Sequence, residues 1–191
     1  MSVGRALLGV GALAVAAVAV GLAPETEDIV RPFPVRGVQG ERVEARTLGA
    51  EVEGIGAAEE VTVEYGFAPP ALPTEGFWLV VEATVTTWKE RQSLTYASVR
   101  VGDATYRTFS SLPAPALVGY SFDPGVPVTG QLLFELPDEA LDTAVAEGIE
   151  VSFAAGIDPR LDTVAVVEVE GSDVELRPTI AIERAVVEGR G

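Results

Sequence analysis

Carboxylates are the most numerous side chains in this sequence that could do chemistry, whereas histidine and cysteine are both absent. There are 29 acidic and 13 basic residues, which gives a formal net charge of −16. Without histidine or cysteine the chain lacks the commonest general base near neutral pH, a thiol nucleophile and the commonest transition-metal ligands. Three possibilities remain: acid–base catalysis by paired carboxylates, a serine–lysine dyad, and calcium binding through oxygen ligands.

None of these possibilities is supported by residue spacing. A serine–lysine dyad requires a desolvated lysine, but the single lysine, Lys89, lies in a polar turn before Ser93. Asp158, Asp162 and Asp173 lie near predicted loops, but their spacing does not resemble a calcium-binding EF-hand loop. The carboxylate pairs fit solvated positions in strands or turns better than a catalytic pair. They are Glu59-Glu60, Asp138-Glu139 and Glu168/Glu170. We therefore expect a non-catalytic protein that uses no metal and no cofactor.

The charge also restricts the class of partner. All 29 acidic residues and all basic residues except Arg5 follow Pro24, so the charge is concentrated outside the N-terminal segment. A surface this negative repels phosphate backbones, and the sequence predicts no binding of nucleic acid.

The first 23 residues indicate where the protein is located. The run from Ala6 to Ala23 contains eighteen residues without a charged side chain, preceded by Arg5. As a helix it would measure about 27 Å, close to the roughly 30 Å of a hydrocarbon core. We expect residues 1–23 to form a transmembrane signal anchor with the N-terminus inside and the domain outside. The alternative is a cleaved signal, because Ala17-Val18-Ala19 has the form that a signal peptidase recognises, and the domain would then be secreted.

Residues 24–39 are predicted to be a proline-containing tether. Pro24, Pro32 and Pro34 disfavour helix and sheet and favour extended backbone. A more compact alternative is that Phe33 and Val35 fold back onto the domain that follows.

The remaining sequence alternates apolar and polar residues with a period of two. This pattern is typical of half-buried strands and predicts a sandwich of two antiparallel sheets over residues 40–172, with 173–191 as a C-terminal strand or tail. In one strand Phe134 faces the core and Leu133 the opposite side, so we expect Phe134→Ala to cost more stability than Leu133→Ala. The alternating segments are 43–47, 61–65, 77–88, 97–101, 104–109, 131–136, 149–153 and 165–169.

Three local features complete the predicted fold. The pair Gly102-Asp103 suits a tight hairpin, and Pro137–Ala146 is expected to form one short helix capped by Asp138. Trp78 and Trp88 share one strand face about 33 Å apart, too far for a single sugar-stacking platform, so we expect them to cap opposite ends of the sandwich.

Three segments carry a family resemblance: GFWLVVEATV at 76–85, GDATY at 102–106 and DPGVPVTGQLLFELP at 123–137. Over about residues 45–155 the chain resembles a bacterial family of extracellular immunoglobulin-like domains, related in fold to a small secreted immunogenic antigen of mycobacteria. The resemblance implies an all-β, immunoglobulin-like sandwich on the cell exterior and assigns no activity. Many members carry a lipid-anchoring cysteine that this chain lacks, which fits a membrane helix taking that role.

Two proline-rich loops are unusually apolar and are the candidate contact surface. They either cover the sandwich ends or bind a partner, and their candidate residues are Phe67, Pro69, Pro70, Leu72, Leu112, Pro113, Pro115 and Leu117. We expect an outward-facing accessory module that contacts another envelope protein. The alternative is a module that binds cell-wall polymer or another extracellular ligand, which clustered exposed aromatic residues in a groove would favour.

Overall fold

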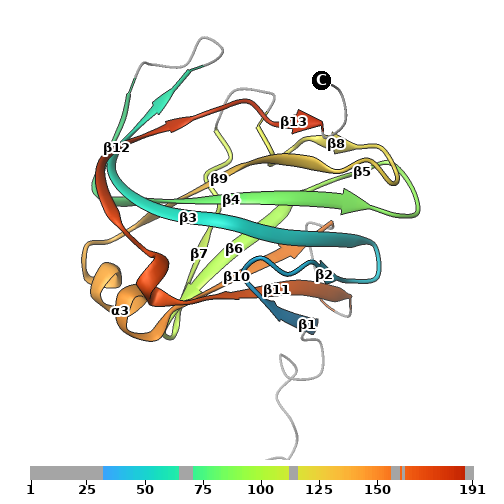
Figure 1. Ribbon diagram of the computed structural model, residues 1–191, viewed down its shortest axis with the longest axis horizontal. Coiled ribbons are helices and arrows are strands. Elements are labelled where there is room, and N and C mark those ends of the chain that lie inside the picture. The colour runs from blue at the N-terminus through green and yellow to red at the C-terminus, as the bar shows by residue number, and fades with distance from the viewer. Residues whose placement is uncertain (1–31, 65–70, 112–115, 156–159, 161, 188–191) are drawn as a thin grey trace, which may run out of the picture. The chain divides into compact units, whose positions relative to one another are not determined.

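Two β-sheets pack face to face in the computed structural model, which describes residues 32–64, 71–111, 116–155, 160 and 162–187 (Figure 1). The first sheet has the order β1-β11-β10-β6-β7. Its strands are β1 (Phe33–Val38), β6 (Tyr96–Val101), β7 (Ala104–Arg107), β10 (Ile149–Ala154) and β11 (Thr163–Val169). The all-β sandwich predicted from the sequence is therefore confirmed.

The second sheet has the order β12-β3-β4-β9-β13, and β2 also pairs with β3. Its strands are β2 (Val43–Glu44), β3 (Leu48–Val63), β4 (Leu72–Thr87), β9 (Val128–Leu136), β12 (Leu176–Ile182) and β13 (Val186–Val187). Two short strands, β5 (Gln92–Ser93) and β8 (Ser121–Phe122), form a separate antiparallel pair.

The period-two pattern correctly predicts which residues fill the space between the sheets. In β4 the side chains of Phe77, Leu79, Val81, Ala83 and Val85 are all buried in the main core. Apolar residues of the other long strands meet them there, and burying this surface away from water is the main force that holds the sheets together.

The outer face of the second sheet is also covered, which the period-two pattern did not predict. Ala58, Val61, Trp78, Leu133 and Ile182 form a second buried cluster there. Leu133 is completely buried, as is its neighbour Phe134 in the main core, so the expectation that Leu133 is the less buried of the two is wrong. The ring of Phe109 packs edge-on against this cluster, 5.4 Å from that of Trp78.

Two edge strands run parallel to their neighbours, which corrects the prediction of purely antiparallel sheets. Strand β1 pairs with β11 in parallel, and β12 pairs with β3 in parallel. Strand β12 contains Pro178, which is tolerated because an edge strand leaves one side of its backbone unpaired.

These two strands also correct the predicted domain boundaries. Residues 24–31 of the expected tether lie outside the described residues, and residues 33–38 are not a tether, because β1 belongs to the sandwich, as in the compact alternative. The stretch 173–191, expected to be a C-terminal strand or tail, contains the strands β12 and β13 of the second sheet, so the sandwich extends past residue 172.

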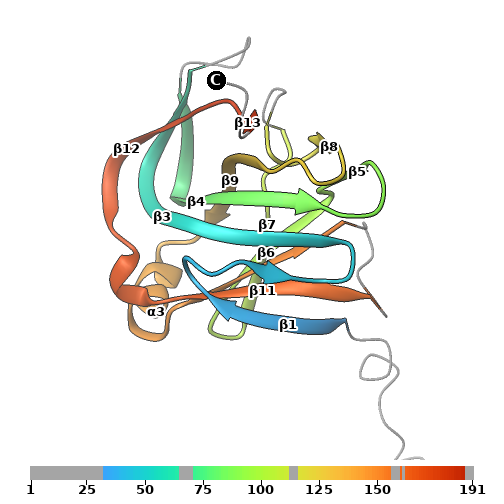
Figure 2. The same ribbon diagram turned by 45° about the vertical axis from the view of Figure 1, so that its right-hand side comes forward.

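The single α-helix of the described residues, α3 (Glu139–Glu147), lies at one end of the sandwich (Figure 2). Asp138 occupies its N-cap position as expected, but its side chain makes no capping hydrogen bond. A 3-10 turn, η1 (Gly171–Asp173), packs beside the helix. Gly102, with φ +54°, and Asp103 make the predicted two-residue turn between β6 and β7.

The predicted membrane anchor at residues 1–23 lies outside the described residues. Within the part of the chain that the structure describes, no helix has the length and apolar composition needed to cross a membrane.

The two tryptophans do not cap opposite ends of the main core as expected. Trp78 lies in the outer cluster, and its indole N–H donates to the carbonyl of Leu72. Trp88 is half-buried against Gly49, under the guanidinium of Arg42 at 4.7 Å from the ring centre.

Candidate functional site

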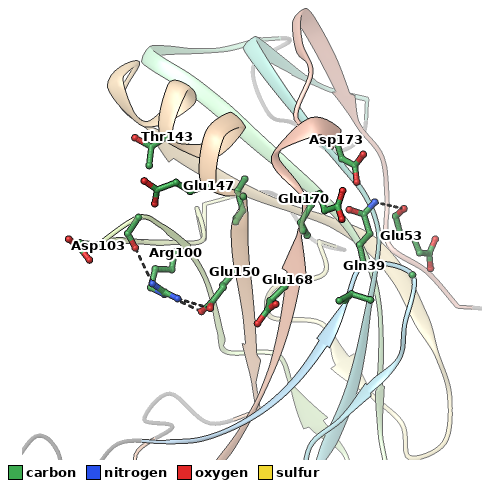
Figure 3. Close-up of a pocket in the computed structure, with 16 residues that line it drawn as sticks. Gln39, Glu53, Arg100, Asp103, Thr143, Glu147, Glu150, Glu168, Glu170 and Asp173 are labelled. Atoms are coloured by element: carbon green, nitrogen blue, oxygen red, sulfur yellow. Dashed lines mark hydrogen bonds and ion pairs between the residues drawn. The ribbon is translucent and has the colours of Figure 1, made fainter.

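An open cavity of about 1070 Å³ lies at the end of the sandwich that carries α3. Seven carboxylates line it against a single guanidinium, that of Arg100. Figure 3 shows these side chains around one opening. The carboxylates are those of Glu53, Asp103, Glu147, Glu150, Glu168, Glu170 and Asp173.

These carboxylates come from four stretches of the chain, at residues 53, 103, 147–150 and 168–173, and close backbone packing brings several of them together. Gly148, with φ +81°, ends α3 and leads directly into β10. A Cβ at Gly171 would lie only 2.1 Å from the carbonyl oxygen of Val145, so only glycine allows η1 to approach the helix this closely. This contact holds Glu147 on the helix close to Glu170 and Asp173.

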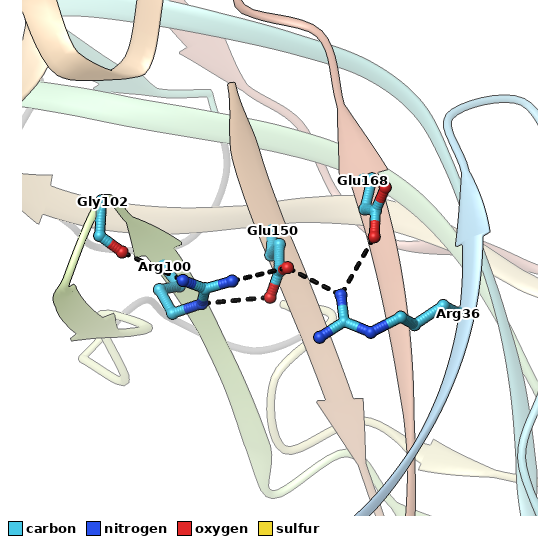
Figure 4. Close-up of polar contacts among 5 residues, drawn as sticks. All are labelled: Arg36, Arg100, Gly102, Glu150 and Glu168. Atoms are coloured by element: carbon cyan, nitrogen blue, oxygen red, sulfur yellow. Dashed lines mark hydrogen bonds and ion pairs between the residues drawn. The ribbon is translucent and has the colours of Figure 1, made fainter. Parts of the chain in front are cut away.

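Glu150 is the centre of an ion-pair network that crosses the first sheet (Figure 4). Its Oε1 atom lies 2.6 Å from Nη1 of Arg36 on β1 and 2.6 Å from Nη2 of Arg100 on β6. Arg36 also donates to Glu168 on β11 at 3.0 Å, and Arg100 donates to the carbonyl of Gly102 at 3.1 Å. The network therefore links four strands, β1, β11, β10 and β6, at the cavity.

The network shifts the pKa values of Glu150 and Arg36. Partial burial would raise the pKa of the Glu150 carboxyl, but the hydrogen bonds from Arg100 and Arg36 outweigh this and hold the pKa below its usual range. The hydrogen bond to Glu150 raises the pKa of Arg36 above its already high value. Glu150 is therefore an ionised structural carboxylate at neutral pH and a poor proton donor.

The other five carboxylates carry the negative charge of the cavity. Ion pairs described in the structure involve only Glu150 and Glu168 among the seven. Glu53 accepts a hydrogen bond from Thr84. Within the described ranges no three carboxylates are grouped tightly enough to hold a metal ion. The arrangement suits a ligand that spreads several positive charges over a wide opening.

The candidate residues of the two apolar loops that the structure describes do not line this cavity. Phe67, Pro69 and Pro70 of the first loop lie outside the described residues, as do Leu112, Pro113 and Pro115 of the second. Of the two that are described, Leu117 is completely buried in the main core. Leu72 packs against the outer cluster beside Trp78. Both therefore cover the sandwich, as in the first of the two alternatives for these loops.

Most of the other groups considered from the sequence lie away from the cavity. Asp162 pairs with Arg46 at 2.9 Å, and the hydrogen bond from Arg46 holds the pKa of this carboxyl below its usual range, against a smaller opposing effect of burial. Lys89 is exposed. Only the pair Glu168/Glu170 belongs to the cavity, together with Asp173. No local pattern in the sequence marks the site, because the order of the strands and the position of the helix bring its residues together.

Similarity to known proteins is limited to solved structures of low sequence identity. No family model matches the chain, and no curated protein matches it. Solved structures similar to it include an uncharacterized β-sandwich protein from Clostridium difficile 630, with 13% identity over 76% of this chain and 99% of that one, at a TM-score of 0.46. The yjhA protein of Bacillus subtilis has 17% identity over 70% and 99%, at 0.48. The secreted protein MPT63 of Mycobacterium tuberculosis has 17% identity over 71% and 98%, at 0.44.

Proposed function

We propose that this protein is a non-catalytic binding module of the cell envelope that uses the acidic cavity to contact a positively charged segment of another envelope protein. The observation that carries the proposal is the cavity itself, in which seven carboxylates face one arginine. The negative charge of the cavity attracts a cationic segment over several ångströms. This attraction favours rapid and specific association.

The absence of catalytic candidates in the sequence supports a binding role. The chain has neither histidine nor cysteine, and the most buried cavity carboxylate, Glu150, is already occupied by two arginines. None of the described residues that line the cavity is aromatic. Sugar recognition commonly uses exposed aromatic faces, so the lining favours a protein segment over a cell-wall polymer.

The envelope location and the family are part of the same proposal. They are supported by the apolar run Ala6–Ala23, which fits a membrane anchor or a secretion signal, and by the immunoglobulin-like resemblance. If the run is a retained anchor, the full chain should sediment with membranes and resist carbonate extraction. Recovery of a soluble chain beginning near Val20 would replace the anchor with a cleaved signal.

The binding proposal can be tested with a lysine-rich peptide and a neutral peptide of equal length, using fluorescence anisotropy on the full chain in detergent. We expect the cationic peptide alone to bind and its affinity to fall as salt is raised. The double variant Glu147→Gln/Glu170→Gln should weaken binding about five- to thirtyfold, since each lost surface charge is worth about 0.5–1 kcal/mol.

The matched control is Glu59→Gln/Glu64→Gln, which removes the same charge from exposed positions outside the cavity. This control should bind almost as the wild type does. Equal losses in both double variants would mean that the peptide senses only net charge, and the cavity would not be its site.

A further inference from the structure

Strand β1 forms one edge of the first sheet and has an unpaired side. The N–H groups of Phe33 and Gln39 donate to the carbonyls of Asp162 and Glu168, at 2.8 and 2.9 Å. The odd-numbered residues of β1 therefore direct their backbone groups toward β11. The even-numbered residues direct theirs to the opposite side, where no strand of the described part pairs with β1.

The unpaired side has a specific pattern of donors and acceptors. Pro34 offers a carbonyl but has no N–H. Arg36 offers both groups. Val38 offers its N–H, while its carbonyl already accepts from the N–H of Glu41 at 3.0 Å, in the turn that ends the strand. The side thus presents two donors and two acceptors, arranged symmetrically about Arg36.

We propose that β1 pairs antiparallel with β1 of a second copy of this chain, with Arg36 opposite Arg36. In this register the two Arg36 residues exchange both of their backbone hydrogen bonds. Each Val38 N–H donates to the carbonyl of Pro34 in the other copy. Pro34, which has no N–H, then lies opposite the Val38 carbonyl of the other copy, which already accepts from Glu41 of its own chain. Four hydrogen bonds therefore form between the copies, and no backbone group is left without a partner.

Neighbouring registers match less well. A shift that places Pro34 opposite Arg36 leaves the carbonyl of each Arg36 without a donor. A shift that places Arg36 opposite Val38 directs the Arg36 N–H at the carbonyl that Glu41 already occupies. An edge strand with unpaired groups favours pairing, and here the pattern selects one register.

The side chains and charges fit the same arrangement. Phe33 and Val38 are 61% and 50% exposed, and with Val35 they make up three of the six exposed large apolar residues in the described part of the chain. The Arg36 side chain is held by Glu150 and Glu168 of its own copy, which offsets repulsion between the two arginines. The Val38 end of β1 borders the acidic cavity. The other end carries the ion pair of Arg46 and Asp162, so antiparallel pairing keeps the two acidic cavities at opposite ends of the paired strands.

The absence of cysteine allows a clean cross-linking test. Full chains carrying Pro34→Cys or Val38→Cys alone are purified in detergent, then oxidised separately and as an equal mixture. In the proposed register positions 34 and 38 of the two copies face each other at a Cα separation of about 5.5 Å, within the range of a disulfide. The same position in both copies would be about 13 Å apart, too far to bridge.

We expect a disulfide-linked dimer only in the mixture. The matched control is a mixture of Thr105→Cys and Arg107→Cys, two exposed positions on β7 at the opposite edge of the same sheet, which should not cross-link. Melting curves of all variants should match the wild type, because the substituted side chains are exposed.

Cross-linking of either β1 variant alone would indicate parallel pairing or random collision. That result, or no cross-link in the mixture, would overturn the proposal. The peptide-binding proposal would be unaffected.

Discussion

Leu133 and Phe134 are consecutive residues of β9 that point to opposite faces of the sheet, and both are completely buried. We therefore expect Leu133→Ala and Phe134→Ala to destabilise the protein by similar amounts, about 2–5 and 3–5 kcal/mol. Urea unfolding followed by fluorescence would measure both. Glu135→Gln, at the exposed next position, serves as the control and should cost less than 1 kcal/mol. A small loss for Leu133→Ala alone would show that the outer cluster is loosely packed.

Replacement of Glu150 should weaken the sandwich because two arginines lose their common partner. We expect Glu150→Gln to cost about 1–2 kcal/mol, since the side chain of Glu150 is mostly buried while its arginine partners are half-exposed. Glu44→Gln removes a more exposed partner at 3.7 Å from Arg42 and should cost almost nothing. Equal unfolding free energies for these two variants would show that the network adds no stability.

The stability of the protein should fall in acid partly through Glu150 and Asp162. Both carboxyls have a pKa held below the usual range in the folded state. Their contribution is therefore fully present above the unfolded-state pKa of about 4 and is lost as the pH falls through the lower folded-state values. The raised pKa of Arg36 adds no change here, because Arg36 stays protonated throughout.

This pH dependence can be measured from melting temperatures between pH 7 and pH 2.5. The difference between the wild type and the double variant Glu150→Gln/Asp162→Asn should shrink steadily below pH 4. A difference that stays constant down to pH 2.5 would contradict the assignment.

Gly76 is a position where any side chain should be costly. A Cβ there would lie 2.1 Å from the carbonyl oxygen of Leu136 and 2.9 Å from Cα of Pro137, both of which are backbone atoms. We expect Gly76→Ala to destabilise the protein by about 2–4 kcal/mol, because strands β4 and β9 must separate. Gly119→Ala is the comparison: its φ of +78° is strained for alanine but nothing lies within 4 Å, so the cost should be about 1 kcal/mol. Calorimetry of both variants would distinguish steric overlap from backbone strain.

The sequence predicted the core faces of the long strands because burial on one side of a sheet imposes a period of two. That rule identifies the inward residues of β4 and β9 without knowledge of their partners. It does not reveal what covers the other face. Leu133 is buried by Ile182 and Trp78, and Ile182 lies far away in the sequence.

The parallel pairing of β1 and β12 and the acidic cavity were not predictable for a similar reason. Parallel partners are joined by long connections, so no turn signal marks the pairs Phe33–Thr163 and Leu176–Ala57. In a chain with 29 acidic residues, no local pattern distinguishes the seven that surround the cavity. Only the completed sheet order places Glu53 and Asp173 at the same opening.

Because β1 begins at Phe33, only a short segment could separate the domain from a bilayer. If residues 6–23 span the membrane as proposed, only the nine residues from Pro24 to Pro32 bridge the distance between Ala23 and the first strand. Fully extended, nine residues cover at most about 32 Å. Every sandwich would then be confined to a thin layer at the membrane surface. Neighbouring copies would meet at a high effective concentration, and a partner would have to enter that layer to be bound.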